Sequence, residues 1–161
     1  MRFVAEHCAG HYQNAVEVGS RNMNGTARVL IDADDYLGVD MFDGPCVDLV
    51  ADARDLDYRN VDLVLCLEVL EHDPAPFALA AHLAGWLRPG GLLVLTCATD
   101  PRAPHGADMG PDEHYGNVDP DGLRDALAGF GWFRAVEVDR TDGDLRIVLE
   151  RGGLEHGSSS C

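Results

Sequence analysis

A glycine turn and a carboxylate carry the first chemical signal in this chain. Gly19 follows Val16 and Val18, β-branched apolar residues typical of a strand inside a covered parallel sheet. A glycine at the end of such a strand lets the backbone approach a ligand closely, because no Cβ stands in the way. Asp40 ends a second apolar stretch about 20 residues later, where an acid in a dinucleotide-binding fold accepts hydrogen bonds from ribose hydroxyls. We therefore expect a ribose-bearing ligand at the carboxyl ends of these two strands.

Short apolar strands alternating with helical patterns must position these residues. The sequence predicts strands at 15–18, 36–40, 47–53, 61–68, 92–97, 132–138 and 145–150, and helices at 26–32, 73–87 and 120–130. Asn24 is the expected N-cap of the first helix, and 89–91 (Pro-Gly-Gly) is expected to end the second. Only 41–46 separate the second and third strands, whereas a parallel crossover usually needs about a dozen residues, so we expect no helix there.

Composition favours one acidic domain. The chain has 161 residues, with 12 Lys and Arg against 28 Asp and Glu, a net charge of −16. This charge disfavours binding to nucleic acids and to anionic membranes, so the expected partner is a small molecule or another protein. The five cysteines have no paired spacing and no signal peptide is recognisable, which favours a cytoplasmic protein. No apolar run approaches the roughly 20 residues that span a bilayer.

Taken in order, the motifs resemble those of the class I S-adenosylmethionine-dependent methyltransferases of the small type 11 sort. The resemblance is carried by Val-Glu-Val-Gly-Ser at 16–20 with Asn-Gly at 24–25, Gly-Val-Asp at 38–40, Val-Ala-Asp-Ala at 50–53, Glu-Val-Leu-Glu-His at 68–72 and Leu-Arg-Pro-Gly-Gly at 87–91. It implies an α/β, Rossmann-like three-layer sandwich whose mostly parallel seven-stranded sheet has an antiparallel last strand. We expect 1–151 to form this single domain and 152–161 to be a disordered tail.

The resemblance also implies a role for individual residues in binding S-adenosylmethionine, with S-adenosylhomocysteine as the product. Residues expected to line the methionine part are Glu17, Gly19 and Ser20. Asp40 would bind the ribose hydroxyls with Met41 beside the adenine, and Asp52 and Ala53 would meet the adenine edge. Cys66 and Leu67 would close the other side.

The glycine turn departs from the family pattern. Residues 20–24 stand where many members carry two more glycines. This difference would place Arg21 or Asn24 against the carboxylate of the cofactor, or it would mark weak binding. The absent helix after the second strand removes part of the adenine wall.

A general base is needed only if the methyl acceptor must lose a proton. His114 and Tyr115, in the long 100–117 loop, are the first candidates for catalytic residues, against the simpler interpretation of exposed loop residues. His72 is a weaker candidate. We predict no metal site, because His7 and His11 have no third firm ligand nearby in the sequence.

The sequence therefore predicts a methyltransferase acting on a small-molecule acceptor, such as an oxygen or nitrogen of a sugar or metabolite. A homodimer or another partner is an alternative way to complete the acceptor site in so short a chain. The alternative function is a catalytically silent module that keeps the fold for interaction. A nicotinamide-dinucleotide domain is disfavoured, because Gly19 has no second glycine before Gly25.

Overall fold

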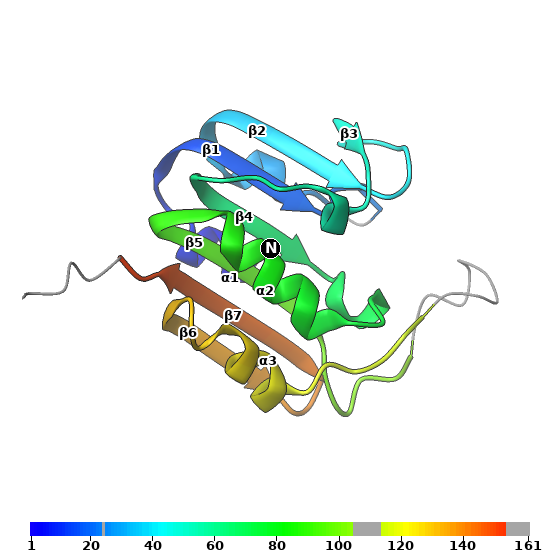
Figure 1. Ribbon diagram of the computed structural model, residues 1–161. Helices are drawn as coiled ribbons and strands as arrows, with labels where there is room; N and C mark the ends of the chain where they lie inside the picture. Colours follow the sequence, from blue (N-terminus) through cyan, green and yellow to red (C-terminus); the bar gives the residue numbers. More distant parts are fainter. Residues whose placement is uncertain (24, 105–113, 154–161) are drawn as a thin grey trace, which may run out of the picture.

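The computed structural model describes residues 1–23, 25–104 and 114–153, and its centre is one seven-stranded sheet (Figure 1). The strands are β1 His11–Val18, β2 Asp32–Asp40, β3 Leu49–Val50, β4 Val61–Leu67, β5 Leu87–Ala98, β6 Gly131–Asp139 and β7 Asp144–Arg151, in the order β3-β2-β1-β4-β5-β7-β6. Strands β1 to β5 pair in parallel, and β7 is antiparallel to both β5 and β6. The predicted α/β sheet with an antiparallel closing strand is confirmed.

Helices cover the two faces of the sheet unequally. The helices α2 Pro76–Trp86 and α3 Pro120–Leu127 lie on one face, and α1 Arg2–His7 lies on the other (Figure 1). The short 3₁₀ turns are η1 Ala27–Leu30, η2 Ala53–Asp55 and η3 Leu70–His72. Under α2 and α3 the core includes Leu83, Leu123 and Ile147, and under α1 Phe3 and Val4 belong to a smaller core. The three-layer arrangement is therefore present, with one thin layer.

No helix connects β2 to β3, as predicted. Eight residues suffice for this parallel connection because β3 has only two residues, which pair with the last two of β2. The connection folds back closely on β2: a Cβ on Gly38 would lie 2.3 Å from the carbonyl oxygen of Cys46. The predicted third strand at 47–53 was too long.

Strand β2 begins at Asp32 rather than at 36, and the predicted helix at 26–32 is only the 3₁₀ turn η1. Two further strand boundaries were wrong for a tertiary reason. Strand β1 begins at His11 because the buried Asp62 carboxylate accepts hydrogen bonds from the backbone N–H groups of Gln13 and Asn14, at 2.7 and 3.1 Å. Strand β5 begins at Leu87 and runs through the Pro-Gly-Gly segment, where Arg88 forms an ion pair with the same Asp62. Pairing with β4 is irregular there, which accommodates the glycines.

One predicted helix cap differs in detail. Thr26 caps η1 by accepting a hydrogen bond from the Arg28 N–H at 3.2 Å, whereas Asn24, the predicted cap, lies outside the described residues. Asp119 caps α3 by accepting a hydrogen bond from the N–H of Gly122 at 2.8 Å. In the described part of the chain, no helix is both long and apolar enough to cross a membrane.

Candidate functional site

The carboxyl ends of β1, β2 and β4 bring the predicted site residues to one edge of the sheet. Parallel pairing aligns Val18 with Val39 on one side and with Cys66 on the other. The residues that follow these strands, and the end of β4, therefore share this edge: Gly19, Ser20, Arg21, Asp40, Met41, Cys66 and Leu67. Such an edge is where ligands bind in open α/β sheets.

Gly19 makes the turn after β1 possible. Its φ is +77°, and a Cβ would lie 2.2 Å from the Cγ2 atom of Val69. The N–H groups of Gly19 and Ser20 both donate to the carbonyl of Val39, at 2.9 and 3.1 Å, so the turn is held against the end of β2. Ser20 is buried, and its hydroxyl oxygen has no hydrogen-bond partner among the described residues. The turn thus carries a buried polar atom with unused hydrogen-bonding capacity.

Asp40 lies beside that turn with a half-buried carboxylate. One of its oxygens accepts from the Arg21 N–H at 3.1 Å, and the other accepts from the Phe42 N–H at 2.9 Å. A carboxylate has about four acceptor positions, so each oxygen retains a lone pair for a hydroxyl donor. Met41, next in the chain, is 59% exposed and offers an apolar surface beside the carboxylate.

The Arg21 side chain lies against the β2–β3 connection, close enough that a Cβ on Gly44 would be 2.9 Å from its Nε atom. The Asn22 N–H donates to the carbonyl of Pro45 at 2.9 Å in the same region. The turn after β1 therefore packs directly on the segment that replaces the missing helix. Asn24, the other residue predicted to meet the cofactor carboxylate, lies outside the described residues.

Asp52 is largely engaged within its own turn. Its carboxylate caps η2 through the N–H of Arg54 at 2.9 Å and pairs with the guanidinium of the same arginine at 3.0 Å. Arg54 also pairs with Asp73, which is buried at the start of the segment leading to α2. Ala53 is buried, and Cys66 is fully buried, which raises the pKa of its thiol.

The Glu17 side chain lies between β1, β2 and η1. It is 4% exposed, its Oε2 accepts from the hydroxyl of Tyr36 at 2.7 Å, and burial raises the pKa of its carboxyl group. Arg28 lies 5.0 Å from the centroid of the Tyr36 ring and pairs with Asp48 at 2.9 Å. Glu17 therefore ties β1 to β2 and η1, in addition to the role beside methionine that the sequence predicts.

The two predicted catalytic residues differ in environment. His114 is exposed. Tyr115 is partly buried, and its ring packs edge-on against His72 with 5.5 Å between ring centroids. Burial first, and then the nearby Glu71, raise the pKa of the Tyr115 hydroxyl. The structure thus places Tyr115, rather than His114, against the segment that follows β4.

Glu71 is a buried acid to which the sequence analysis assigned no role. Its side chain is 0% exposed, one oxygen accepts from the Ala98 N–H at 3.3 Å, and the other has no hydrogen-bond partner among the described residues. Burial raises its pKa to about 7. The signal available in the sequence was its place, three residues after the acid that ends an almost wholly apolar strand. An acid so soon after a buried strand lies in η3, where the chain is still inside the protein.

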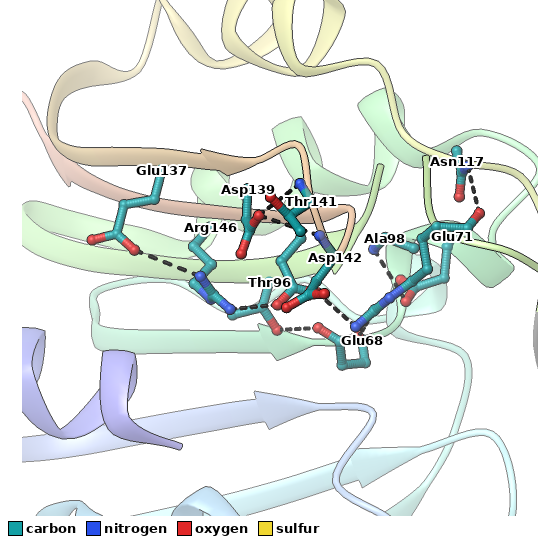
Figure 2. A network of polar contacts seen from close by, with 12 residues as sticks. Glu68, Glu71, Thr96, Ala98, Asn117, Glu137, Asp139, Thr141, Asp142 and Arg146 are labelled. Carbon is teal, nitrogen blue, oxygen red and sulfur yellow. Dashed lines mark hydrogen bonds and ion pairs between the residues drawn. The ribbon is translucent and has the colours of Figure 1, made fainter. Parts of the chain in front are cut away.

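A cavity of about 540 Å³ lies between α1 and the carboxyl ends of β4 and β5, extending over β6 and β7. Its lining combines apolar and charged side chains: Met1, Arg2, Phe3, Val4, Glu6, Leu67, Glu68, Thr96, Arg102, Glu137, Asp144 and Arg146. Figure 2 shows the polar network on this face, in which Thr96 donates to Glu68 at 2.7 Å and Arg146 faces Glu137. Because Leu67 and Glu68 line it, the cavity reaches the edge that carries the predicted cofactor residues.

A family model described as a methyltransferase domain matches residues 8–95, more than half of the chain. The chain belongs to the methyltransferase domain family. The matched region runs from the end of α1 into β5, so all of the motifs at the carboxyl ends of β1 to β4 lie within it. No curated protein sequence matches the chain.

Solved structures place this methyltransferase domain in the class I fold. The 1,6-didemethyltoxoflavin-N1-methyltransferase of Burkholderia thailandensis, with bound 1,6-didemethyltoxoflavin and S-adenosylhomocysteine, has a TM-score of 0.69 at 18% identity, covering 94% of this chain and 76% of that chain. The N-methyltransferase NodS from Bradyrhizobium japonicum WM9, in complex with S-adenosylhomocysteine, has a TM-score of 0.66 at 15% identity, covering 94% and 84%. A chain of the Haloferax volcanii complex that contains the Trm112 methyltransferase activator has a TM-score of 0.72 at 14% identity, covering 96% and 89%.

Proposed function

We propose that this chain binds S-adenosylmethionine at the carboxyl ends of β1, β2, β3 and β4 and transfers its methyl group to a small molecule. The observation that carries the proposal is the Asp40 carboxylate, which lies beside the Gly19 turn with acceptor capacity to spare. Membership of the methyltransferase domain family supports the same assignment. One similar structure is an N1-methyltransferase with bound 1,6-didemethyltoxoflavin and another is the N-methyltransferase NodS, which favours a small-molecule acceptor.

The side chains at this edge fit the cofactor. Asp40 supplies acceptors for ribose hydroxyls, and Met41 supplies an apolar surface for a flat base. The buried Ser20 hydroxyl, which lacks a partner among the described residues, is available to a polar group of the methionine part. Asp52 retains a lone pair beyond its contacts with Arg54, enough to accept one further N–H donor. When bound, the cofactor supplies a methyl group that is already activated on a sulfonium.

The chain's own task is to position the acceptor and to exclude water. Holding two reacting groups in line contributes roughly 7–11 kcal/mol in well-oriented systems. Tyr115 acts in this scheme as a hydrogen-bond donor, because a tyrosine hydroxyl is protonated near neutral pH and burial raises its pKa further here. His114, which is exposed, is the residue we propose to accept a proton from an acceptor that must lose one.

One observation favours the alternative of a catalytically silent module. The Asp52 carboxylate already caps η2 and pairs with Arg54, so adenine recognition there competes with two existing contacts. A silent module would keep the sheet and bind no S-adenosylhomocysteine.

Isothermal titration with S-adenosylhomocysteine separates these two functions. We expect the wild-type chain to bind, and Asp40→Ala to weaken binding by about 10-fold to 100-fold through the loss of charge-assisted hydrogen bonds. Asp43→Ala is the matched control, since Asp43 is an exposed acid in the β2–β3 connection. Circular dichroism establishes that each variant is folded. A folded wild-type chain that releases no heat would contradict the proposal and favour the silent module.

A further inference from the structure

We infer that the cavity between α1 and the ends of β4 and β5 takes the methyl acceptor, and that this acceptor is a small amine bound as its ammonium. The inference rests on the proposed function, because it assigns a substrate class to the same reaction. Its basis is the pairing pattern of the charged groups that line the cavity.

The cavity has the size and place of a site for a small acceptor. Its volume of about 540 Å³ lies within the range of roughly 300–1,000 Å³ found for small-molecule sites. Leu67 and Glu68 line it, and Leu67 is also predicted to close the cofactor site. A molecule in the cavity therefore lies next to the edge where we propose that the methyl donor binds.

Each of the three guanidinium groups in the lining is already bound by a carboxylate. Arg102 bridges Glu68 and Asp144, at 2.6 Å to each. Arg146 also pairs with Asp144, and Arg2 pairs with Glu6 at 2.7 Å. An anionic acceptor would have to compete with these carboxylates for its cation, which makes binding of an anion costly.

Glu137 is the carboxylate in the lining with the weakest pairing. The nearest cation is Arg146 at 3.7 Å, beyond hydrogen-bond distance, and the Glu137 side chain is 51% exposed. In Figure 2, Glu137 faces the Arg146 guanidinium from the neighbouring strand. Arg2, the other cation that acts on Glu137, is engaged by Glu6. The Glu137 carboxylate thus has acceptor positions available to a ligand with N–H donors.

Thr96 provides a second acceptor on β5. Its hydroxyl donates to Glu68 at 2.7 Å, which leaves its oxygen lone pairs available to a ligand N–H. Arg146 of β7 lies between Thr96 and Glu137 in the sheet, so the two acceptors serve different donors of a ligand. An ammonium presents three N–H donors and no acceptor, which suits the Glu137 carboxylate. A neutral alcohol offers that carboxylate one donor and no positive charge.

The reaction balances with an amine as acceptor. An ammonium releases its proton to water through the open side of the cavity near the half-exposed Glu137, so this acceptor needs no proton transfer to His114, which is not in the lining. The nitrogen lone pair then forms a bond to the methyl carbon. The carbon–sulfur bond breaks, and the sulfur keeps the bonding electrons as a neutral thioether. The products are a methylated ammonium, S-adenosylhomocysteine and one proton.

Three probes with the same ring test the preference for charge. Cyclohexylamine, cyclohexanol and cyclohexanecarboxylate are titrated by ligand-observed NMR into the full chain loaded with S-adenosylhomocysteine. We expect the amine to bind most tightly and the carboxylate least. Glu137→Gln should weaken binding of the amine by about 5-fold to 10-fold while the affinity for S-adenosylhomocysteine stays unchanged.

Asp35→Asn is the control for total charge, because Asp35 is an exposed acid on β2 outside the cavity lining. It should leave binding of the amine unchanged. Equal effects of the two variants, tighter binding of the carboxylate, or no binding of the amine would each overturn the inference. If the wild-type chain does not bind S-adenosylhomocysteine, the proposed function is contradicted instead, so the two failures are distinguishable.

Discussion

Glu71 shows how the environment of one residue changes its chemistry. Its side chain is completely buried, yet only one of its two oxygens has a hydrogen-bond partner among the described residues. Burial disfavours the charged form, and Glu68 nearby adds repulsion, while Arg102 opposes it. The pKa of Glu71 is raised to about 7, so the carboxyl group is largely protonated in mildly acidic solution.

This shift predicts a pH dependence of stability. The pKa is 4.5 in the unfolded chain and about 7 in the folded one, so the folded state binds the proton more strongly. The stability that this group contributes is present below pH 4.5 and is lost as the pH rises toward 7. Between pH 4.5 and pH 8, the free energy of unfolding of the wild type should therefore fall by about 3 kcal/mol relative to that of Glu71→Gln.

Urea denaturation of both chains across this pH range measures the effect. Only the difference between the two chains is used, because the other acids titrate in both. Asp57→Asn, at an exposed site, should show no such trend. A difference that is flat between pH 4.5 and 8 would mean that Glu71 is ionised throughout.

At the scale of elements, the turn between β1 and η1 depends on Gly19. The positive φ is costly for any residue with a Cβ, and Val69 lies where that Cβ would be. Gly19→Ala should lower the free energy of unfolding by about 2 kcal/mol and abolish binding of S-adenosylhomocysteine. Denaturant titration and calorimetry check the two parts. Gly129→Ala is the control, because apart from its chain neighbours no described residue has an atom within 4 Å of its added Cβ. Unchanged binding by Gly19→Ala would refute the role of the turn.

Asp62 connects three elements through one buried carboxylate. It accepts from two N–H groups at the start of β1 and pairs with Arg88 in β5, while itself lying in β4. Asp62→Ala should destabilise the fold by about 2 kcal/mol, because two partly buried N–H donors and a half-exposed guanidinium lose their partner. Urea denaturation measures this loss, with Asp57→Ala as the exposed control. A loss below about 0.5 kcal/mol would show that the register of β1 does not depend on Asp62.

At the scale of the whole molecule, the net charge of −16 opposes the folded state. Like charges repel more strongly in the compact chain than in the unfolded one, and salt screens this repulsion. The melting temperature should therefore rise as sodium chloride is increased from about 0.01 to about 0.5 M. Thermal unfolding followed by tryptophan fluorescence measures it. A melting temperature that falls with salt would show that the ion pairs outweigh the repulsion.

Much of the fold was predictable because it depends on local patterns. Apolar β-branched runs such as 61–67 indicate buried parallel strands, and the turn at 141–143 indicates the closing hairpin. The short β2–β3 connection excluded a helix by length alone. The residues at the carboxyl ends of the strands could be gathered from these patterns, because parallel strands end at the same edge.

The sequence by itself determined the order of elements, the family and the edge of the sheet that carries the predicted cofactor residues. Only the tertiary structure decided that the Glu17 carboxylate bonds Tyr36, that β5 begins at Leu87, and that Glu71 is buried. Only the structure also showed that Glu137 has the weakest ion pairing in a cavity whose cations are otherwise taken. The physical reason is that burial and ion pairing depend on groups far apart in the chain, and no local pattern records which of them meet.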